Sequence, residues 1–219
     1  MRVLLIAPDQ PGINGIAEVR AITSQHRVMV LNGPVSVADV YDAARHGRYD
    51  ILHFAAHSHD RELDLSAGEV MTPEDVAQVG RNANAKLIFF NSCRSGLLAD
   101  YVIRHGVAFA IHSNIELPDD DAWKMPSVFY DFVAEQRDRN AVDYASAFEQ
   151  ADSGDGVYGL SVAIDRCSSW EPLMVRLQAS ETRIAALVAQ QQRTTLMQWG
   201  LTGLLVANVG LSLFATFWR

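Results

Sequence analysis

Residues 86–96 read KLIFFNSCRSG, an apolar run that ends in polar residues and a turn. The apolar part has the length of one β-strand, and Ser95 and Gly96 begin a turn just after Cys93. A second stretch, DILHFAAHSHD at residues 50–60, has the same layout. Both runs are apolar at successive positions, which is typical of strands buried on both faces of a parallel sheet. The two stretches therefore predict a mostly parallel sheet.

Runs of this kind recur along the chain and alternate with helical patterns. The expected strands are 2–6, 27–31, 50–54, 86–91, 107–112 and about 157–164. The expected helices lie near 15–24, 37–46, 73–79, 97–105, 122–137 and 140–151. Ser36 and Thr72 have the chemistry of helix N-caps, and Pro73 suits a first helical turn. Because strands and helices alternate, we predict an α/β fold, a three-layer sandwich around a mostly parallel sheet of about six strands.

The composition limits the classes of function. The 219 residues are 49% hydrophobic, enough for one globular domain with a core and a further segment. The net charge of −8 argues against nucleic acid as a direct partner, because nucleic-acid-binding domains carry basic surfaces. Cys93 and Cys167 are the two cysteines, and the N-terminus does not resemble a secretory signal. We therefore expect reduced cysteines in a cytosolic environment.

The C-terminal part has a different pattern. Residues 172–197 form an amphipathic helical pattern, which predicts a stalk. Residues 199–218 read WGLTGLLVANVGLSLFATFW, 20 positions without a charge and with aromatic residues at both ends. That length suits a helix crossing about 30 Å of hydrocarbon, although a buried core helix or a partner-binding helix is an alternative. The expected division is a domain at 1–165, a linker and stalk at 166–198, and a transmembrane helix at 199–218.

The expected span also predicts location and assembly. Arg183 and Arg193 precede it and only Arg219 follows it, a bias that places the N-terminal domain in the cytoplasm. One face of the span is a stripe of small residues, where a second copy can pack closely: Gly203, Ala207 and Gly210. We therefore expect a single-pass inner-membrane protein that contacts the lipid bilayer through 199–218 and forms a homo-oligomer.

The three histidines after the strand at 50–54 suggest a metal site, but their spacing does not support one. In a metallo-hydrolase pattern of the H-x-H-x-D-H type that begins at His57, Asp60 comes one position too early and Glu62 takes the place of the last histidine. The chain has no H-E-x-x-H and no C-x-x-C motif. We expect neither a metal ion nor another cofactor.

Cys93 alone does not predict a catalytic site. A phosphatase loop requires arginine where the chain has Ala99, and a thioredoxin motif requires cysteine at Phe90 or Gly96. A lone cysteine is usually a small buried hydrophobe. However, His57 follows one expected strand and Cys93 follows the next, and the carboxyl ends of parallel strands share one edge of the sheet. A thiol and an imidazole at that edge have the chemistry of a nucleophile and its base.

These two motifs resemble those of a known family. HFAAHS at 53–58 and NSCRSG at 91–96 are similar to the H-F-A-G-H-G and S-A-C-E-S-G motifs of CHAT-domain proteases, caspase-like cysteine peptidases related to separase, clostripain and gingipain. Residues 3–24 look like the opening strand and glutamate-containing helix of that family, and residues 105–151 and 157–164 look like its last part. The resemblance covers roughly residues 1–165.

The resemblance implies roles for particular residues. His57 corresponds to the general base and Cys93 to the nucleophile, with the oxyanion held by the backbone N–H groups of Ser58 and Cys93. Ser58 and Ala56 stand where the family usually has glycine, and a serine is strained there if φ must be positive. Asp119 and Asp120 are expected to bind a basic substrate residue. Alternatively, they are ordinary N-cap or first-turn acids that stabilise the N-terminus of the helix at 122–137.

The remaining histidines near the motif are expected to play minor parts. His53 is expected to pack or hydrogen-bond beneath the site, and His59 and Asp60 to lie in a solvated loop.

Together these expectations describe a membrane-anchored, caspase-like cysteine endopeptidase that cuts a protein substrate. Small CHAT proteases resemble regulated effectors of prokaryotic conflict or immunity systems, and this chain has no sensor domain of its own, so a separate sensor or activator protein is expected. The main alternative is a non-catalytic CHAT-like scaffold whose transmembrane helix oligomerises and acts on the membrane. A soluble small-molecule hydrolase with an apolar tail is the least favoured alternative.

Overall fold

The structure is a computed structural model that describes residues 1–11, 15–24, 26–59, 61–117, 122–136, 141–154 and 156–163. The expected stalk, the expected span at 199–218 and the expected domain boundaries lie outside these ranges, as do Asp60, Asp119, Asp120 and Cys167. Within the described ranges, each helix is too short or too polar to cross a bilayer.

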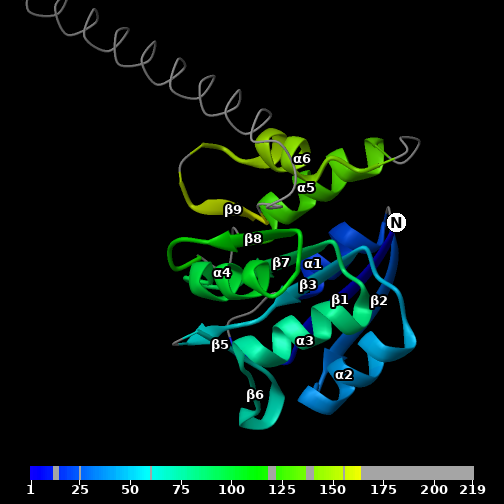
Figure 1. Cartoon of the computed structure of the whole chain (residues 1–219), viewed down its shortest axis with the longest axis vertical. Coiled ribbons are helices and arrows are strands. Elements are labelled where there is room, and N and C mark those ends of the chain that lie inside the picture. The colour runs from blue at the N-terminus through cyan, green and yellow to red at the C-terminus, as the bar shows by residue number, and fades with distance from the viewer. Residues whose placement is uncertain are drawn as a thin grey trace, which may run out of the picture. The chain divides into compact units, whose positions relative to one another are not determined.

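Six strands of the described residues form one sheet in the order β2-β1-β3-β7-β8-β9 (Figure 1). Their bounds are β1 Arg2–Pro8, β2 Arg27–Gly33, β3 Ile51–Ala55, β7 Leu87–Asn91, β8 Phe109–Ser113 and β9 Tyr158–Val162. The first five in this order are parallel, and β9 is antiparallel to β8. The mostly parallel sheet of about six strands is therefore confirmed, with each strand close to its expected position.

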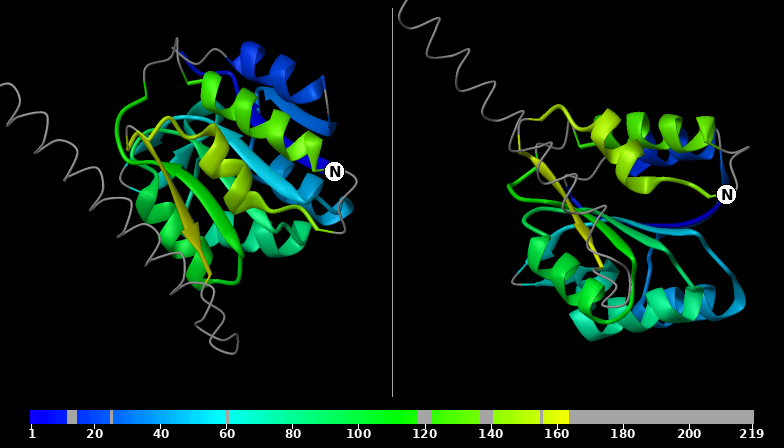
Figure 2. Two further views of the ribbon diagram at one scale, coloured as in Figure 1. Left: turned by 90° about the horizontal axis from the view of Figure 1, so that it is seen from above. Right: turned by 45° about the horizontal axis from the view of Figure 1, so that its top comes forward.

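Helices cover both faces of this sheet (Figure 2). On one face lie α2 Val37–His46, α3 Pro73–Ala83 and α4 Gly96–Arg104, and on the other lie α1 Gly15–Thr23, α5 Lys124–Glu135 and α6 Tyr144–Ala151. Successive residues of β1 serve the two cores in turn, because side chains alternate along a strand: Leu4 and Ile6 pack with α2 to α4, and Val3 and Leu5 pack with α1, α5 and α6. The expected three-layer sandwich is confirmed.

The helix starts follow the expected cap chemistry. The Ser36 hydroxyl accepts a hydrogen bond from the Asp39 backbone N–H, and the Asp39 carboxylate accepts one from the Ser36 N–H. Thr72 and Asp75 make the same reciprocal pair at the start of α3, where Pro73 is in the first turn. These capping boxes satisfy backbone donors that a helix N-terminus otherwise leaves unpaired.

A second, smaller sheet was not expected. The short antiparallel strands β4 Ser58–His59, β5 Glu62–Asp64 and β6 Val70–Met71 lie between β3 and α3, with the 3-10 turn η1 Ser66–Gly68 between the last two. Leu63 and Met71 are buried against the core of α2 to α4. Strands of two or three residues carry too little periodicity to be recognised in a sequence. This small sheet begins immediately after His57 and therefore borders the carboxyl edge of the main sheet.

Candidate active site

His57 and Cys93 lie at equivalent positions on neighbouring strands. Ala55, the last residue of β3, pairs with Asn91, the last residue of β7, in the parallel register. His57 and Cys93 each follow this pair by two residues. Both side chains are half-buried and line one small cavity of about 30 Å³. The sheet thus brings together the two side chains for which the sequence predicts a nucleophile and its base.

The segment after β1 holds His57 in place. The Gln10 side-chain oxygen accepts a hydrogen bond from the His57 backbone N–H at 2.8 Å, and the Pro11 carbonyl oxygen lies 2.9 Å from His57 Nε2. A carbonyl oxygen only accepts, so Nε2 carries the proton in this contact. In the neutral ring the lone pair is then on Nδ1, which is the atom available to take a proton.

Cys93 lies in a tight turn that is tied to β8. The Ser95 hydroxyl donates to the Ser92 carbonyl at 2.9 Å and accepts from the Ser113 N–H at 3.1 Å. The Arg94 N–H donates to the Ile115 carbonyl at 3.1 Å. The segment after β8 also reaches the thiol, because the Leu117 N–H donates to Cys93 Sγ at 3.3 Å. Within the described residues, no hydrogen bond joins this sulfur to the His57 ring.

Ser58 connects the histidine segment to the cysteine turn. Its hydroxyl donates to the Cys93 carbonyl oxygen. Among the described non-glycine residues, positive φ is confined to Arg61, Asn84 and Arg94. Ser58 begins β4 with ordinary backbone geometry, so serine and alanine in place of the usual glycines bring no strain at positions 58 and 56.

A buried polar network forms the floor beneath the cavity. Glu18 of α1 is only 3% exposed, and its Oε1 atom is 2.5 Å from His53 Nε2 and accepts from Asn91 Nδ2 at 2.8 Å. The Tyr158 hydroxyl donates to Asn91 Oδ1 at 2.8 Å. This network joins α1, β3, β7 and β9, and Glu18 itself lines the cavity beside Cys93.

Tyr130 of α5 completes this network. Its hydroxyl lies 3.1 Å from His53 Nδ1. Burial, with the nearby Glu18 charge, raises the pKa of Tyr130 well above its ordinary value, so the hydroxyl stays protonated. A carboxylate only accepts, so in a neutral His53 ring Nε2 carries the proton and Nδ1 accepts from the Tyr130 hydroxyl. His53 Nε2 then donates to Glu18. The expectation that His53 hydrogen-bonds beneath the site agrees with these contacts.

Glu18, Gln10 and Pro11 were not predicted as site residues, although Glu18 is the glutamate of the helix that resembles the glutamate-containing helix of the family. Glu18 had a signal, since it is an acid on the apolar face of α1, four residues before the buried Ile22. Gln10 and Pro11 had none, because their contacts are a side-chain amide and a backbone carbonyl of an ordinary loop. Asp119 and Asp120 lie outside the described residues, although Leu117 and Ala122 on either side of them line the cavity.

A larger cleft of about 330 Å³ borders the same two side chains from the α4 side. His57 and Cys93 line it together with the charged residues Arg61, Arg94 and Glu116, and buried Leu98 lies beneath. His59 borders the cleft as well, 2.8 Å from an Asp64 carboxylate oxygen. Over the described ranges, no three histidine, cysteine or acidic side chains gather as metal ligands do.

The fold of the described domain is similar to that of a solved cysteine proteinase. The crystal structure of gingipain R, an arginine-specific cysteine proteinase, matches the chain with a TM-score of 0.50 and 13% sequence identity, over 68% of this chain and 40% of the gingipain chain. The fold is caspase-like. Because the match covers 40% of the gingipain chain, this chain spans less than half of the length of gingipain R. In this caspase-like domain, His57 and Cys93 follow the two central strands β3 and β7.

A second solved structure matches less well. A flavodoxin from the domain Archaea matches with a TM-score of 0.38 and 11% identity, over 62% of this chain and 98% of the flavodoxin. No protein-family model matches the sequence, and no curated protein matches it.

Proposed function

We propose that the chain is a cysteine endopeptidase in which Cys93 is the nucleophile and His57 the general base. The observation that carries this proposal is the common position of the two residues. Each follows the Ala55–Asn91 pair by two residues, and both side chains line one cavity at the carboxyl edge of a caspase-like sheet. Chemistry in open parallel sheets gathers at this edge.

The hydrogen bonds of the site suggest how the reaction proceeds. With Nε2 donating to Pro11, His57 accepts the thiol proton on Nδ1. The sulfur attacks the peptide carbonyl carbon, and the backbone N–H groups of Ser58 and Cys93 stabilise the negative oxygen. His57 returns the proton to the leaving amine as the C–N bond breaks, and water then hydrolyses the thioester.

The cavity indicates how a peptide is held. The acyl half of the substrate stays bound through both steps, so we assign it to the side of the dyad where the buried Glu18 and Asn91 line the small cavity. An apolar groove of about 390 Å³ continues from there, since Leu117 and Ala122 line both. Asp119 and Asp120 remain our proposal for recognition of a basic residue before the scissile bond.

We further propose that residues 199–218 anchor the enzyme in the inner membrane with its protease domain in the cytoplasm. Packing through Gly203, Ala207 and Gly210 gives a homo-oligomer, and a separate activator triggers cleavage of a protein target in a conflict or immunity response. The support for these points is the uncharged 20-residue stretch and its small-residue stripe.

Co-expression of the chain with the products of neighbouring genes tests the protease function. A partner protein should be cleaved with the wild-type chain and left intact with Cys93→Ala. Cys167→Ala is the matched control, because it removes the other cysteine and should leave cleavage unchanged. If the cellular effect persists in a folded Cys93→Ala variant, the protease proposal is wrong and the scaffold alternative is supported.

A further inference from the structure

The larger cleft beside Cys93 has a charge opposite to that of the chain. The whole chain has a net charge of −8. Among the described residues that line the cleft, however, Arg61 and Arg94 face one acid, Glu116. Arg94 pairs with Glu116 at 2.9 Å, and both side chains are more than 70% exposed, so this ion pair is weak and exchangeable. Arg61 is exposed and has no hydrogen-bond or ion-pair partner within the described residues.

The backbone at these arginines is unusual. Arg61 has φ +83° and Arg94 has φ +48°, in the left-handed region where glycine or asparagine is favoured. Among the described residues, the other non-glycine position of this kind is Asn84, the C-cap of α3, where asparagine is ordinary. Arg61 occupies a two-residue connection between β4 and β5 that normally takes glycine. Two arginines with energetically unfavourable backbone conformations line one cleft, and such conformations cluster at functional sites.

The position of the cleft defines what enters it. His57 and Cys93 line both this cleft and the small cavity, which lies on the α1 and α5 side of the sheet, whereas the cleft lies on the α4 side. A peptide that crosses the dyad therefore places one flank in each. The acyl flank is assigned to the cavity, where the buried Glu18 and Asn91 form part of the lining. The leaving flank then lies in the cleft, which is lined by exposed Arg61, Arg94 and Glu116 and from which it departs after the first step.

We propose that this cleft is a substrate subsite that binds a carboxylate on the leaving half of the peptide, through Arg61 and Arg94. The carboxylate belongs to an aspartate or glutamate just after the scissile bond, or to a nearby free C-terminus, which offers the same chemistry. Arg61 is available to pair with this carboxylate, and Arg94 pairs with it by giving up its ion pair with Glu116. This inference rests on the proposed function for its substrate, but the charge of the cleft is testable without cleavage.

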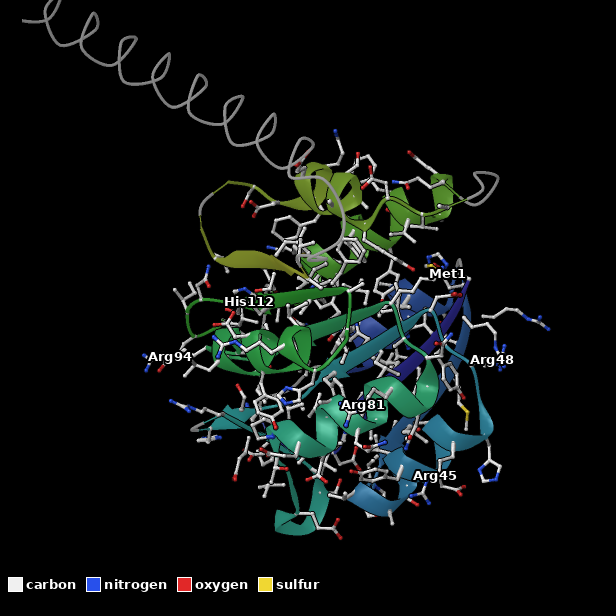
Figure 3. All side chains as sticks on the ribbon, viewed as in Figure 1. Met1, Arg45, Arg48, Arg81, Arg94 and His112 are labelled. Atoms are coloured by element: carbon white, nitrogen blue, oxygen red, sulfur yellow. The ribbon has the colours of Figure 1, made fainter. Side chains whose placement is uncertain are left out.

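The first test alkylates Cys93 in the full chain with iodoacetate and with iodoacetamide, and reads the modified peptide by mass spectrometry. Both reagents form the S–C bond with loss of iodide, and they differ in charge. Arg61→Glu should lower the ratio of the iodoacetate rate to the iodoacetamide rate about fivefold, and 0.5 M salt should reduce the difference. Arg48→Glu is the control, since it makes the same charge change on the opposite side of the domain from Arg94 (Figure 3). An unchanged ratio in Arg61→Glu overturns the inference whether or not the chain is a protease.

The second test maps cleavage sites in a proteome-derived peptide library with free C-termini. The wild-type chain should enrich Asp and Glu after the scissile bond about fivefold, Arg61→Lys should keep this preference, and Arg61→Glu and Arg61→Gly should lose it. Arg61→Gly should also raise the melting temperature, which shows that the preference is not lost through misfolding. Cleavage at a constant distance from peptide ends assigns the carboxylate to the free C-terminus.

The outcomes separate the two proposals. Cys93-dependent cleavage without any carboxylate preference overturns the subsite and leaves the protease intact. Absence of Cys93-dependent cleavage counts against the protease, and the alkylation ratio then decides the subsite alone.

Discussion

His57 donates a hydrogen bond from Nε2 to the carbonyl oxygen of Pro11 at 2.9 Å. The loop after β1 therefore fixes the tautomer of a histidine that follows β3. Since Gln10 of the same loop binds the His57 backbone N–H at 2.8 Å, the imidazole is held by its main chain and by its ring. The ring nitrogen left over, Nδ1, is the one that the proposed mechanism requires as a base.

Replacement of His57 by asparagine should therefore lower kcat/KM roughly 100- to 10,000-fold, the range for loss of a general base. His59→Asn is a close control, because His59 is an exposed neighbour that pairs with Asp64. It should change kcat/KM less than about twofold. Peptide hydrolysis and circular dichroism of both variants make the comparison, and equal activity of the two variants would remove His57 from the mechanism.

Ser58→Ala should weaken the connection between the histidine segment and the cysteine turn. The variant keeps the backbone N–H but loses the hydroxyl that donates to the Cys93 carbonyl. We expect a loss of about 1 kcal/mol in the free energy of unfolding, the usual net value of one hydrogen bond. Urea denaturation measures this loss, and Ser161→Ala on the edge strand β9 is the comparison. A Ser58→Ala variant as stable as the wild type would show that this hydrogen bond contributes nothing.

The buried Glu18–His53 pair should show strong coupling. His53→Phe leaves the Glu18 carboxylate without its hydrogen-bond donor from His53, among side chains that are almost fully buried, which should cost about 3–5 kcal/mol in unfolding free energy. Glu18→Gln should cost less, because the amide oxygen still accepts a hydrogen bond from Asn91. In the double variant Glu18→Leu with His53→Phe, much of the loss should be recovered. Additive losses in denaturation experiments would contradict a paired role.

His112 should make the domain less stable in acid. Burial lowers the pKa of His112 from its ordinary value of 6.5, partly offset by the charge of Asp100. Its Nδ1 atom is buried without a partner in the described structure, and its ring lies against Gly159. The unfolded chain therefore binds a proton that the folded domain resists, so stability falls as the pH drops below about 6.5.

The melting temperatures at pH 8 and pH 5 measure this effect. The difference between them should be smaller in His112→Gln than in the wild type. The exposed His46 provides the control His46→Gln, which should keep the wild-type difference. A wild-type difference retained in His112→Gln would assign the acid sensitivity to other groups.

The membrane expectation is tested by fractionation. The full chain should remain in the membrane pellet after an alkaline wash, and a chain that ends at residue 198 should appear in the supernatant. Val209→Arg places a charge near the centre of the expected span at a cost of about 3 kcal/mol and should weaken retention. A truncated chain that still sediments with membranes would show that residues 199–219 are not the anchor.

The sequence allowed the main architecture to be predicted because buried parallel strands leave a strong local signal. Each of the six strands of the main sheet is a continuous or nearly continuous apolar run. Ser36 and Thr72 mark the starts of α2 and α3 through hydrogen bonds to residues only three positions further along the chain. The small sheet β4 to β6 was not predictable, because its strands are two or three residues long and depend on burial of Leu63 and Met71 beneath distant helices.

The candidate site divides in the same way. The sequence by itself determined that an imidazole and a thiol follow consecutive buried runs, since residue identity and spacing are local properties. Only the tertiary structure decided that Ala55 pairs with Asn91 and that Pro11 sets the His57 tautomer. It also decided that Glu18 lines the same cavity as Cys93 and that Arg61 shares a cleft with Arg94. These arrangements bring together residues from 33 positions apart (Arg61 and Arg94) to 75 apart (Glu18 and Cys93). The order of strands in the sheet creates them, and no local pattern encodes that order.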